Sequence, residues 1–315
     1  MGEKIVFMGT PEFAVESLKN LLDCGMNVAA VVTAPDRPAG RGRKIQLSAV
    51  KEYALSKGIV VLQPERLKNE QFLQDLKAIQ ADLFVVVAFR MLPEVVWQMP
   101  PKGTINLHGS LLPDYRGAAP INWAVINGET KTGATTFFIE KEIDTGKIID
   151  KVSIDIGKNE TAGELHDRLM VAGAKLLSES VEKVLDGSVT PVDQNKLMQG
   201  TLKAAPKIFK PDCKINWNNS AQEIHNKIRG LSPYPTAWTE ISKDGQLKSL
   251  KLFTSRFHPS HQNSNGQLKV EDERLFIGAN DGWVEILTLQ LEGKKKMNTS
   301  DFLKGFPITE WKINP

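Results

Sequence analysis

The sequence predicts an α/β protein in which a doubly wound, mostly parallel sheet is followed by a smaller β-barrel domain of the OB type. Over about the first two hundred residues, short apolar runs alternate with helical patterns. After a connector that contains several prolines, a group of short strand-like segments fills the remaining hundred or so residues. Alternation of strands with helices is typical of parallel sheets covered on both faces. Closely spaced short strands are typical of small barrels.

The expected sheet strands are short, rich in β-branched residues and bounded by Gly, Asn or Pro, as buried strands are. They lie at residues 5–8, 28–32, 60–62, 83–88 and 104–107, and a further apolar segment lies at 135–139. The first helix is expected to begin at Thr10, a hydroxyl cap, with Pro11 at its first helical position. Two more helices are expected at residues 50–56 and 69–79.

A longer helix is expected from Thr161, which forms a capping box with Glu164, to Gly187. Residues 188–212 have little periodicity and read as a connector. A second capping box at Ser220 and Glu223 predicts a short helix. Strands are then expected near residues 238–241, 250–257, 275–278 and 283–291. The resulting division is a first domain at 1–190, a linker at 191–205 and a second domain at 206–315.

The composition is that of a folded globular protein: 41% of the 315 residues are hydrophobic and 24% are charged. No apolar run approaches the roughly 18 residues that a membrane-spanning helix needs. The N-terminus enters its first strand without the long apolar core of a signal peptide. Cys24 and Cys213 are far apart and have no histidine nearby. We therefore expect a cytoplasmic protein with no membrane segment, no disulfide framework and no metal site.

Ligands of an open parallel sheet bind beyond the carboxyl ends of its strands, so residues that directly follow strands come first as candidates. The strand at 104–107 leads through Asn106 into His108, and the segment at 135–139 leads into Asp144. Asn106 and His108 are two apart on a strand and share one face. An amide and an imidazole there suit an oxyanion site for acyl transfer. Asp144 would orient the imidazole and stabilise its protonated form, although a loop histidine and an ordinary turn carboxylate are the alternative.

Other motifs are missing from the sequence or are open to two readings. The first strand is followed by Gly9-Thr10-Pro11, and neither G-x-G-x-x-G nor a phosphate loop nor a G-x-S-x-G elbow occurs. Nucleotide-dependent and serine-hydrolase chemistry are therefore disfavoured. Residues 35–44 form a cationic Gly/Pro loop that suits phosphate contact or simple solvation. Residues 206–315 carry 16 Lys and Arg against 12 Asp and Glu, a mild preference for a polyanionic partner.

Three ordered motifs resemble the signature of the folate-dependent formyltransferases. They are N-L-H-G-S-L-L-P at residues 106–113, R-G-A-A-P at 116–120 and D-T-G at 144–146. Other segments are similar to the branch of this family that acts on methionyl-tRNA. These segments are 7–14, 35–44, 215–217, 228–229 and 233–235.

This resemblance implies a Rossmann-like catalytic domain, an OB-like C-terminal domain and 10-formyltetrahydrofolate as formyl donor. It gives Asn106, His108 and Asp144 the catalytic roles, with no metal. It implies that the donor is held by Ser110, Leu111, Leu112, Pro113, Arg90 and Leu92. Contacts to initiator methionyl-tRNA would come from Arg37, Arg41, Arg43, Lys44, Lys207, Lys210 and Arg229, in a protein that acts as a monomer.

The chain departs from the family after the strand at 83–88. The family usually has a segment like Ala-Tyr-Gly-x-Ile-Leu-Pro, whereas residues 88–93 read A-F-R-M-L-P, which is one residue shorter and has no glycine. Two alternatives stay open. One is a formyltransferase for a small amine, such as glycinamide ribonucleotide, with a chain expected to end near the connector, or a nucleotide-linked amino sugar, with a further dehydrogenase-sized domain. The other is a non-catalytic RNA-binding protein.

Overall fold

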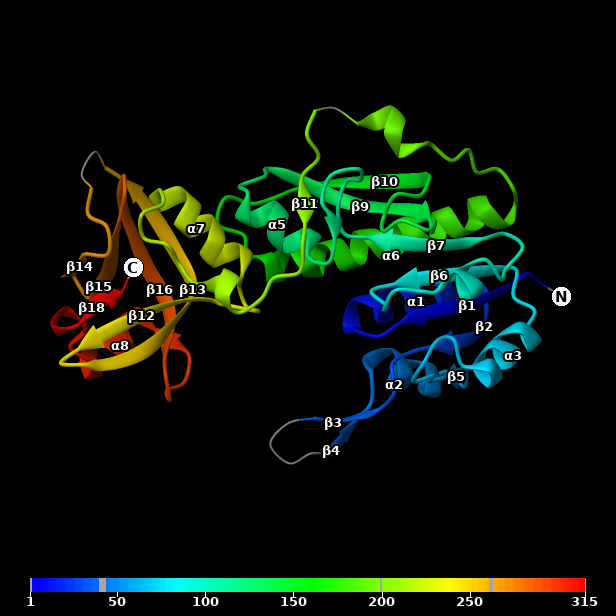
Figure 1. Cartoon of the computed structure of the whole chain (residues 1–315), viewed down its shortest axis with the longest axis horizontal. Coiled ribbons are helices and arrows are strands. Elements are labelled where there is room, and N and C mark those ends of the chain that lie inside the picture. The colour runs from blue at the N-terminus through cyan, green and yellow to red at the C-terminus, as the bar shows by residue number, and fades with distance from the viewer. Residues whose placement is uncertain (1, 40–43, 199, 261–262, 315) are drawn as a thin grey trace. The chain divides into compact units, whose positions relative to one another are not determined.

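The computed structural model describes residues 2–39, 44–198, 200–260 and 263–314 (Figure 1). The chain divides into two compact units. The first unit consists of Met1–Gly117, Gly133–Ile154 and Asp167–Ala204, and the second of Ala118–Thr132, Asp155–His166 and Ala205–Pro315. This division follows compactness in space, so each unit draws on separate stretches of the chain. The domain boundaries expected at residues 190 and 206 follow chain order and stay a prediction.

The sheet of the α/β part has seven strands in the order β10-β9-β7-β6-β1-β2-β5. Neighbours from β7 to β5 pair in parallel, whereas β7 and β9 pair antiparallel. The predicted Rossmann-like, mostly parallel sheet is therefore confirmed. Its strands are β1 (Lys4–Gly9), β2 (Asn27–Val32), β5 (Val60–Leu62), β6 (Leu83–Val87), β7 (Thr104–His108), β9 (Lys131–Phe138) and β10 (Ile148–Asp155).

The helices of the first unit are α1 (Glu12–Asp23), α2 (Ala49–Ser56), α3 (Glu70–Ala78), α4 (Glu94–Trp97) and most of α6 (Ala162–Leu185), whereas α5 (Pro120–Ile126) belongs to the second unit. The start of α1 was predicted one residue early, because Pro11 is its N-cap and no side chain caps it. The capping box before α6 is confirmed. The Glu164 amide donates to Thr161 Oγ1 at 3.2 Å, and the Thr161 amide donates to the Glu164 carboxylate at 2.8 Å. Among the described residues, no helix is long and apolar enough to cross a membrane.

The side chains of β7 alternate between the two faces of the sheet, so this strand contacts a helix on each face. Leu107 points to α6, where a Cβ on Gly173 would lie 3.1 Å from the Leu107 side chain. Thr104 points the other way and donates from Oγ1 to the Trp97 carbonyl of α4 at 2.7 Å. Residues 106 and 108 share the face of Thr104. The expectation that Asn106 and His108 lie on one face thus agrees with the alternation along this strand.

The second unit contains a curled antiparallel sheet in the order β14-β15-β16-β13-β12-β18, and β17 pairs with β16 (Figure 1). Helix α7 begins with the predicted capping box at Ser220 and Glu223. Trp217, Ile228 and Leu252 are among the fully buried residues of its core. The expected OB-like character of the smaller domain agrees with this sheet. Its elements are α7 (Ala221–Gly230), β12 (Ala237–Lys243), β13 (Gln246–Pro259), β14 (Leu268–Glu271), β15 (Arg274–Ala279), β16 (Gly282–Leu291), β17 (Met297–Asn298), α8 (Thr299–Gly305) and β18 (Lys312–Asn314).

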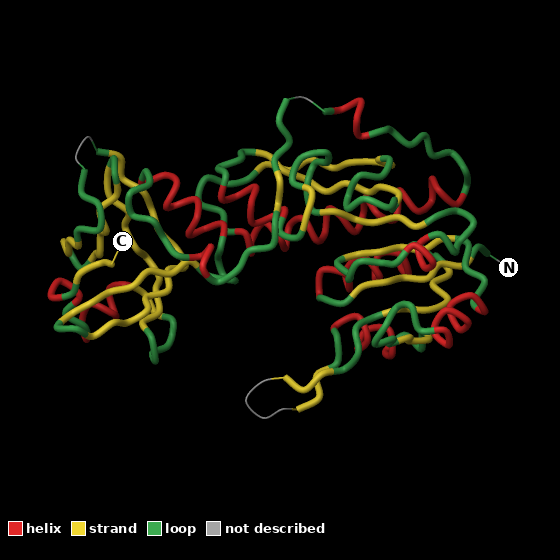
Figure 2. The backbone as a smooth tube through the Cα atoms, in the orientation of Figure 1, coloured by secondary structure: helices red, strands yellow, loops and turns green. Residues whose placement is uncertain are grey.

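Two small strand pairs complete the described secondary structure. Strand β8 (Arg116–Gly117) pairs with β11 (Ala204–Ala205), and β3 (Arg37–Ala39) pairs antiparallel with β4 (Lys44–Gln46). The segment read as a loop at 35–44 therefore includes strand arms, which Figure 2 shows in yellow. Short 3-10 helices lie at Gln194–Leu197, Pro211–Cys213 and Ile308–Glu310.

The β3–β4 pair is anchored where it leaves the sheet. The Asp36 carboxylate accepts hydrogen bonds from Lys51 Nζ at 2.5 Å and from Gln63 Nε2 at 2.8 Å. These two bonds lower the pKa of Asp36. Gln63 Nε2 also donates to the Ala34 carbonyl at 2.8 Å. The base of the pair is therefore tied to α2 and to the end of β5.

His225 on α7 is a buried imidazole, 1% exposed, inside the second unit. Its Nε2 lies 3.4 Å from the Lys158 carbonyl and its Nδ1 lies 3.0 Å from Ser255 Oγ. Because a carbonyl only accepts, Nε2 carries the proton and Nδ1 accepts from the Ser255 hydroxyl. Burial, the largest cause, lowers the pKa of His225 below its usual 6.5. The folded protein therefore holds this imidazole neutral.

We expect His225 to make the stability of the second unit depend on pH. As the pH falls below about 6.5, the unfolded chain binds a proton at residue 225 that the folded chain resists, so the free energy of unfolding falls. His225→Gln removes the titrating group and should reduce this loss. Urea unfolding of both proteins at about pH 7.5 and about pH 5.5 measures the difference. An equal loss in parent and variant would contradict the prediction.

Candidate active site

His108 lies at the carboxyl end of β7, and Asp144 reaches it from the loop after β9. Since β9 runs antiparallel to β7, Phe138 lies opposite Ile105, and β9 ends beside the start of β7, away from His108. The Ile139 amide donates to the Thr104 carbonyl at 2.7 Å, which is the start of this loop. Residues 139–147 must then turn back to bring Asp144 to His108. The sequence predicted that Asp144 follows a strand next to that of His108, which it does, but this strand is antiparallel and the loop after it has to return to reach His108.

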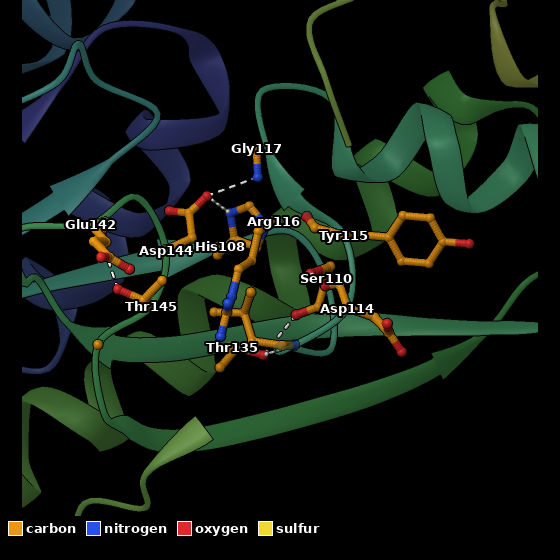
Figure 3. Close-up of polar contacts among 12 residues, drawn as sticks. His108, Ser110, Asp114, Tyr115, Arg116, Gly117, Thr135, Glu142, Asp144 and Thr145 are labelled. Carbon is orange, nitrogen blue, oxygen red and sulfur yellow. Dashed lines mark hydrogen bonds and ion pairs between the residues drawn. The ribbon is translucent and has the colours of Figure 1, made fainter. Parts of the chain in front are cut away.

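The imidazole of His108 is only 6% exposed and has a neighbour on each nitrogen (Figure 3). Nε2 lies 2.8 Å from the Tyr115 carbonyl oxygen. Nδ1 lies 3.7 Å from Asp144 Oδ2. Because the carbonyl can only accept, Nε2 bears a proton in both charge states of the ring. Nδ1 is the ring nitrogen that faces the carboxylate.

The carboxylate of Asp144 is itself held in place. Its Oδ2 accepts a hydrogen bond from the Gly117 amide at 2.9 Å (Figure 3). Asp144 has a φ of 55°, a left-handed conformation that aspartate adopts more readily than most residues. Gly146, two residues on, allows a close approach, since a Cβ there would lie 1.7 Å from the Phe138 carbonyl oxygen. The loop thus turns sharply on both sides of the carboxylate.

The turn after His108 is braced from β9 and β10. Thr135 Oγ1 donates to the Ser110 carbonyl at 2.7 Å and accepts from the Leu112 amide at 3.1 Å. Lys151 Nζ donates to the Leu112 carbonyl, and burial, the largest cause, lowers the pKa of Lys151. Ser110 Oγ donates to the Asp114 carbonyl at 2.7 Å. The expected donor-binding segment is therefore a rigid turn directly beside His108.

The side chains of this segment differ in their access. Leu112 is fully buried and packs with Phe137 and Ile148, and Pro113 is also buried. Ser110 is buried as well, whereas Leu111 is half-buried. A ligand at this turn would therefore meet mainly Leu111 and backbone atoms.

Arg90 and Leu92, the other two expected donor contacts, are engaged with the protein. The Arg90 guanidinium donates to the backbone carbonyls of Pro64 and Glu65, and burial, the largest cause, lowers its pKa. Leu92 is 8% exposed and belongs to the apolar core that also contains Phe72 of α3. Both residues shape the structure after β6. The buried Nε of Arg90, by contrast, has no hydrogen-bond partner among the described residues.

The residues expected to contact a polyanion differ in their surroundings. Arg37 on β3 is exposed, as are Lys207 and Lys210, and Lys207 Nζ lies 5.4 Å from the centre of the Phe209 ring. Arg41 and Arg43 lie outside the described residues, and only the backbone of Lys44 is described, in β4.

Arg229 does not reach the surface. It is 5% exposed, and its Nη1 donates to the carbonyls of Gly157 at 3.3 Å and Glu160 at 3.1 Å. Its Nε donates to Asn226 Oδ1 at 2.9 Å. Burial, the largest cause, lowers the pKa of this guanidinium. These contacts tie Nε and Nη1 of Arg229 to the interior of the second unit.

Three contributors to the site were not anticipated as such from the sequence: the Tyr115 carbonyl, the Gly117 amide and the side chain of Gln194. Gly117 belongs to the R-G-A-A-P motif, but a hydrogen bond from a backbone amide cannot be predicted from a pattern of side chains. Gln194 lies in the connector, where no periodicity points to it. Within the described ranges, no cluster of three or more His, Cys, Asp or Glu could hold a metal ion.

Known protein families match both parts of the chain. The family described as "Formyl transferase" matches residues 3–181, and "Formyl transferase, C-terminal domain" matches residues 207–307. A protein of Bacteroides thetaiotaomicron named "Methionyl-tRNA formyltransferase" is 50% identical, with 99% of this chain and 98% of that protein covered. A protein of Phocaeicola vulgatus with the same name is 53% identical, with 98% and 97% covered.

Solved structures share the fold at lower identity. The sugar 3N-formyl transferase WlaRD, crystallised in the presence of dTDP and 5-N-formyl-THF, has a TM-score of 0.66 at 21% identity and covers 94% of this chain and 100% of its own. Glycinamide ribonucleotide transformylase 1 from Symbiobacterium toebii has a TM-score of 0.52 at 19% identity and covers 61% of this chain and 95% of its own. Because the family matches extend over both halves and the relatives align nearly end to end, this chain belongs to the formyl transferase family.

Proposed function

We propose that this chain transfers the formyl group of 10-formyltetrahydrofolate to the free amino group of initiator methionyl-tRNA, giving N-formylmethionyl-tRNA and tetrahydrofolate. The observation that carries the proposal is the near full-length identity of about half to relatives named for this reaction. The His108–Asp144 pair beside a rigid turn supplies chemistry that fits it. The product places the enzyme at the initiation of translation.

The acceptor amine, as free base, attacks the formyl carbon, and negative charge develops on the formyl oxygen. Asn106 and protonated His108 share one face of β7 and donate to this oxygen. The 3.7 Å between His108 Nδ1 and Asp144 Oδ2 exceeds a hydrogen bond, so Nδ1 keeps a donor for substrate. Asp144 acts through its charge, which favours the protonated ring. It accepts the amine proton, directly or through a water molecule. The tetrahedral intermediate then collapses, the bond between the formyl carbon and the folate nitrogen breaks, and that nitrogen takes up a proton as tetrahydrofolate leaves.

The donor folate supplies an activated formyl group, and the residues after His108 fit its binding. The turn at 110–114 is held by Thr135 and Lys151, so its backbone is preorganised. Ser110, Leu111, Leu112 and Pro113 form this turn, although only Leu111 offers much side-chain surface. Arg90 braces residues 64 and 65, and Leu92 packs in the core, so both act on the donor site by shaping it.

The tRNA is held through its phosphates by exposed cations. Arg37 stands on a strand pair whose base is anchored by Asp36, Lys51 and Gln63, and Lys44 begins the opposite strand. In the sequence Arg41 and Arg43 lie between them. Lys207 and Lys210 are exposed in the second unit. Arg229 supports this unit from inside and is not proposed as a contact. We place the reaction in the cytoplasm, carried out by a monomer.

One specific observation favours a second candidate, a formyltransferase for a nucleotide-linked amino sugar. WlaRD, a sugar 3N-formyl transferase, aligns over all of its crystallised chain. The expectation that such enzymes carry a further dehydrogenase-sized domain is wrong for this neighbour. Incubation with 10-formyltetrahydrofolate and either methionyl-tRNA or a dTDP-linked amino sugar distinguishes the two. Formylation of the sugar alone would overturn the proposed function.

Replacing Asp144 by Asn should lower kcat by about 100-fold or more, because it removes the charge that favours protonated His108. The amide oxygen still accepts from Gly117, so the melting temperature should stay close to that of the parent. His108→Ala should lower kcat as well, and the double variant should have a kcat only slightly below that of either single variant, since both residues act as one unit. Asp75→Asn, on the surface of α3, serves as a control. Rate losses that multiply in the double variant would count against this pairing.

Neutralising the β3–β4 segment should weaken the use of tRNA. Arg41→Ala/Arg43→Ala should lower kcat/KM for methionyl-tRNA about 10-fold and flatten the fall of affinity with salt, because fewer phosphate counterions are released. The KM for the folate donor should change less than about twofold. Lys19→Ala/Lys175→Ala removes the same charge from exposed helix positions and should leave both values unchanged. Equal losses in both double variants would attribute the effect to net charge alone.

A further inference from the structure

Gln194 is a buried residue in an exposed stretch of chain. It opens the short 3-10 helix Gln194–Leu197 and is 1% exposed, whereas Asn195, Lys196 and Leu197 are all exposed. Burying an amide is costly unless its polar atoms are hydrogen-bonded. The burial of this side chain alone therefore calls for partners inside the first unit.

The side-chain amide of Gln194 uses both of its ends. Nε2 donates to the carbonyl oxygens of Asp144 at 2.9 Å and Gly146 at 2.8 Å. Oε1 accepts from Arg116 Nε at 3.2 Å and Nη2 at 2.7 Å. Because carbonyls only accept and a guanidinium only donates, this orientation of the amide is the one that satisfies every contact. Gln194 is thus bonded to two separate segments.

These two segments are the ones that meet at the catalytic carboxylate. Arg116 directly precedes Gly117, whose amide donates to Asp144 Oδ2 at 2.9 Å. Asp144 and Gly146 supply the carbonyls on the other side. The Gln194 amide therefore closes a second connection beside the Gly117–Asp144 hydrogen bond. With only one of these connections, the two segments would keep more freedom to separate.

The loop at 139–147 has reason to need such support. It leaves β9 at the far edge of the sheet and turns back, and Asp144 sits at a φ of 55°. Residues in such sparsely populated conformations persist when their surroundings hold them. The distance between Asp144 and His108 depends on where this loop lies.

We propose that Gln194 is a positioning residue for formyl transfer: it holds the 144–146 loop against Arg116 and thereby sets the place of the Asp144 carboxylate beside His108. This inference rests on the proposed function for its kinetic part only. The role follows from contacts that Gln194 makes to the Asp144 and Gly146 carbonyls and to the Arg116 guanidinium, and within the described part of the chain no hydrogen bond joins its side chain to His108.

The test compares Gln194→Glu and Gln194→Leu with the neighbouring control Asn195→Ala, whose side chain is exposed. Gln194→Glu keeps the size and an acceptor for Arg116 but loses the two donors to the loop. We expect kcat to fall about 10- to 100-fold in both Gln194 variants, with KM for either substrate within about twofold, because a small misplacement of a catalytic group costs that much. Asn195→Ala should match the parent.

Coupling to Asp144 separates positioning from general destabilisation. In the Asp144→Asn background, Gln194→Leu should lower kcat by less than about twofold, since the group it positions is already disabled. A further loss as large as in the parent background, or an unchanged kcat in both single variants, would overturn the proposal.

A second measurement does not depend on activity. Amide hydrogen exchange at Gly117 should be about 10-fold faster or more in Gln194→Glu than in the parent and in Asn195→Ala, because the bond to Asp144 opens more often. Unchanged exchange at Gly117 would also overturn the proposal. If the parent formylates a sugar and not methionyl-tRNA, the proposed function fails while this exchange result still decides the role of Gln194.

Discussion

The candidate site brings a carboxylate and an imidazole together in a largely enclosed place. The side chain of Asp144 is 14% exposed and that of His108 is 7% exposed. Removing a carboxylate from water is costly unless charge and hydrogen bonds replace its hydration. The Gly117 amide replaces part of it, and a protonated His108 would replace more. Much of the surrounding structure, from the sharp loop to the buried amide of Gln194, keeps these partners within reach.

The polar groups of the site lie on β7 and on the strand beside it, β9. The face of β7 that carries Leu107 is closed by α6, where the small Gly173 permits close packing. Only the opposite face can present Asn106 and His108. The antiparallel β9 then contributes twice: Thr135 braces the turn after His108, and the loop after Phe138 returns with Asp144. One strand thus supports both sides of the site.

Elements with a clear hydrophobic period could be predicted from the sequence, and contacts formed by the backbone could not. Both capping boxes are correct because the side chain and the amide that it caps are three residues apart. Tyr115 and Gly117 act through main-chain atoms, and Gln194 acts on a loop about fifty residues away, so no local pattern identifies them. The antiparallel pairing of β9 could not be predicted, because an apolar run reads the same in a parallel and an antiparallel strand.

Counts of charged residues did not predict which arginines are exposed. Arg37 and Arg229 are the same residue type in basic stretches, yet one is exposed and the other donates to backbone carbonyls in the interior. A guanidinium that is buried in the interior adds little to phosphate binding, whatever the net charge of its domain. A shared fold does not identify the acceptor either, since WlaRD, named a sugar 3N-formyl transferase, aligns over the whole of its crystallised chain. Under the proposed function, we therefore expect acceptor choice to depend on exposed side chains and loops, and the His108–Asp144 pair to act on whichever amine is placed beside it.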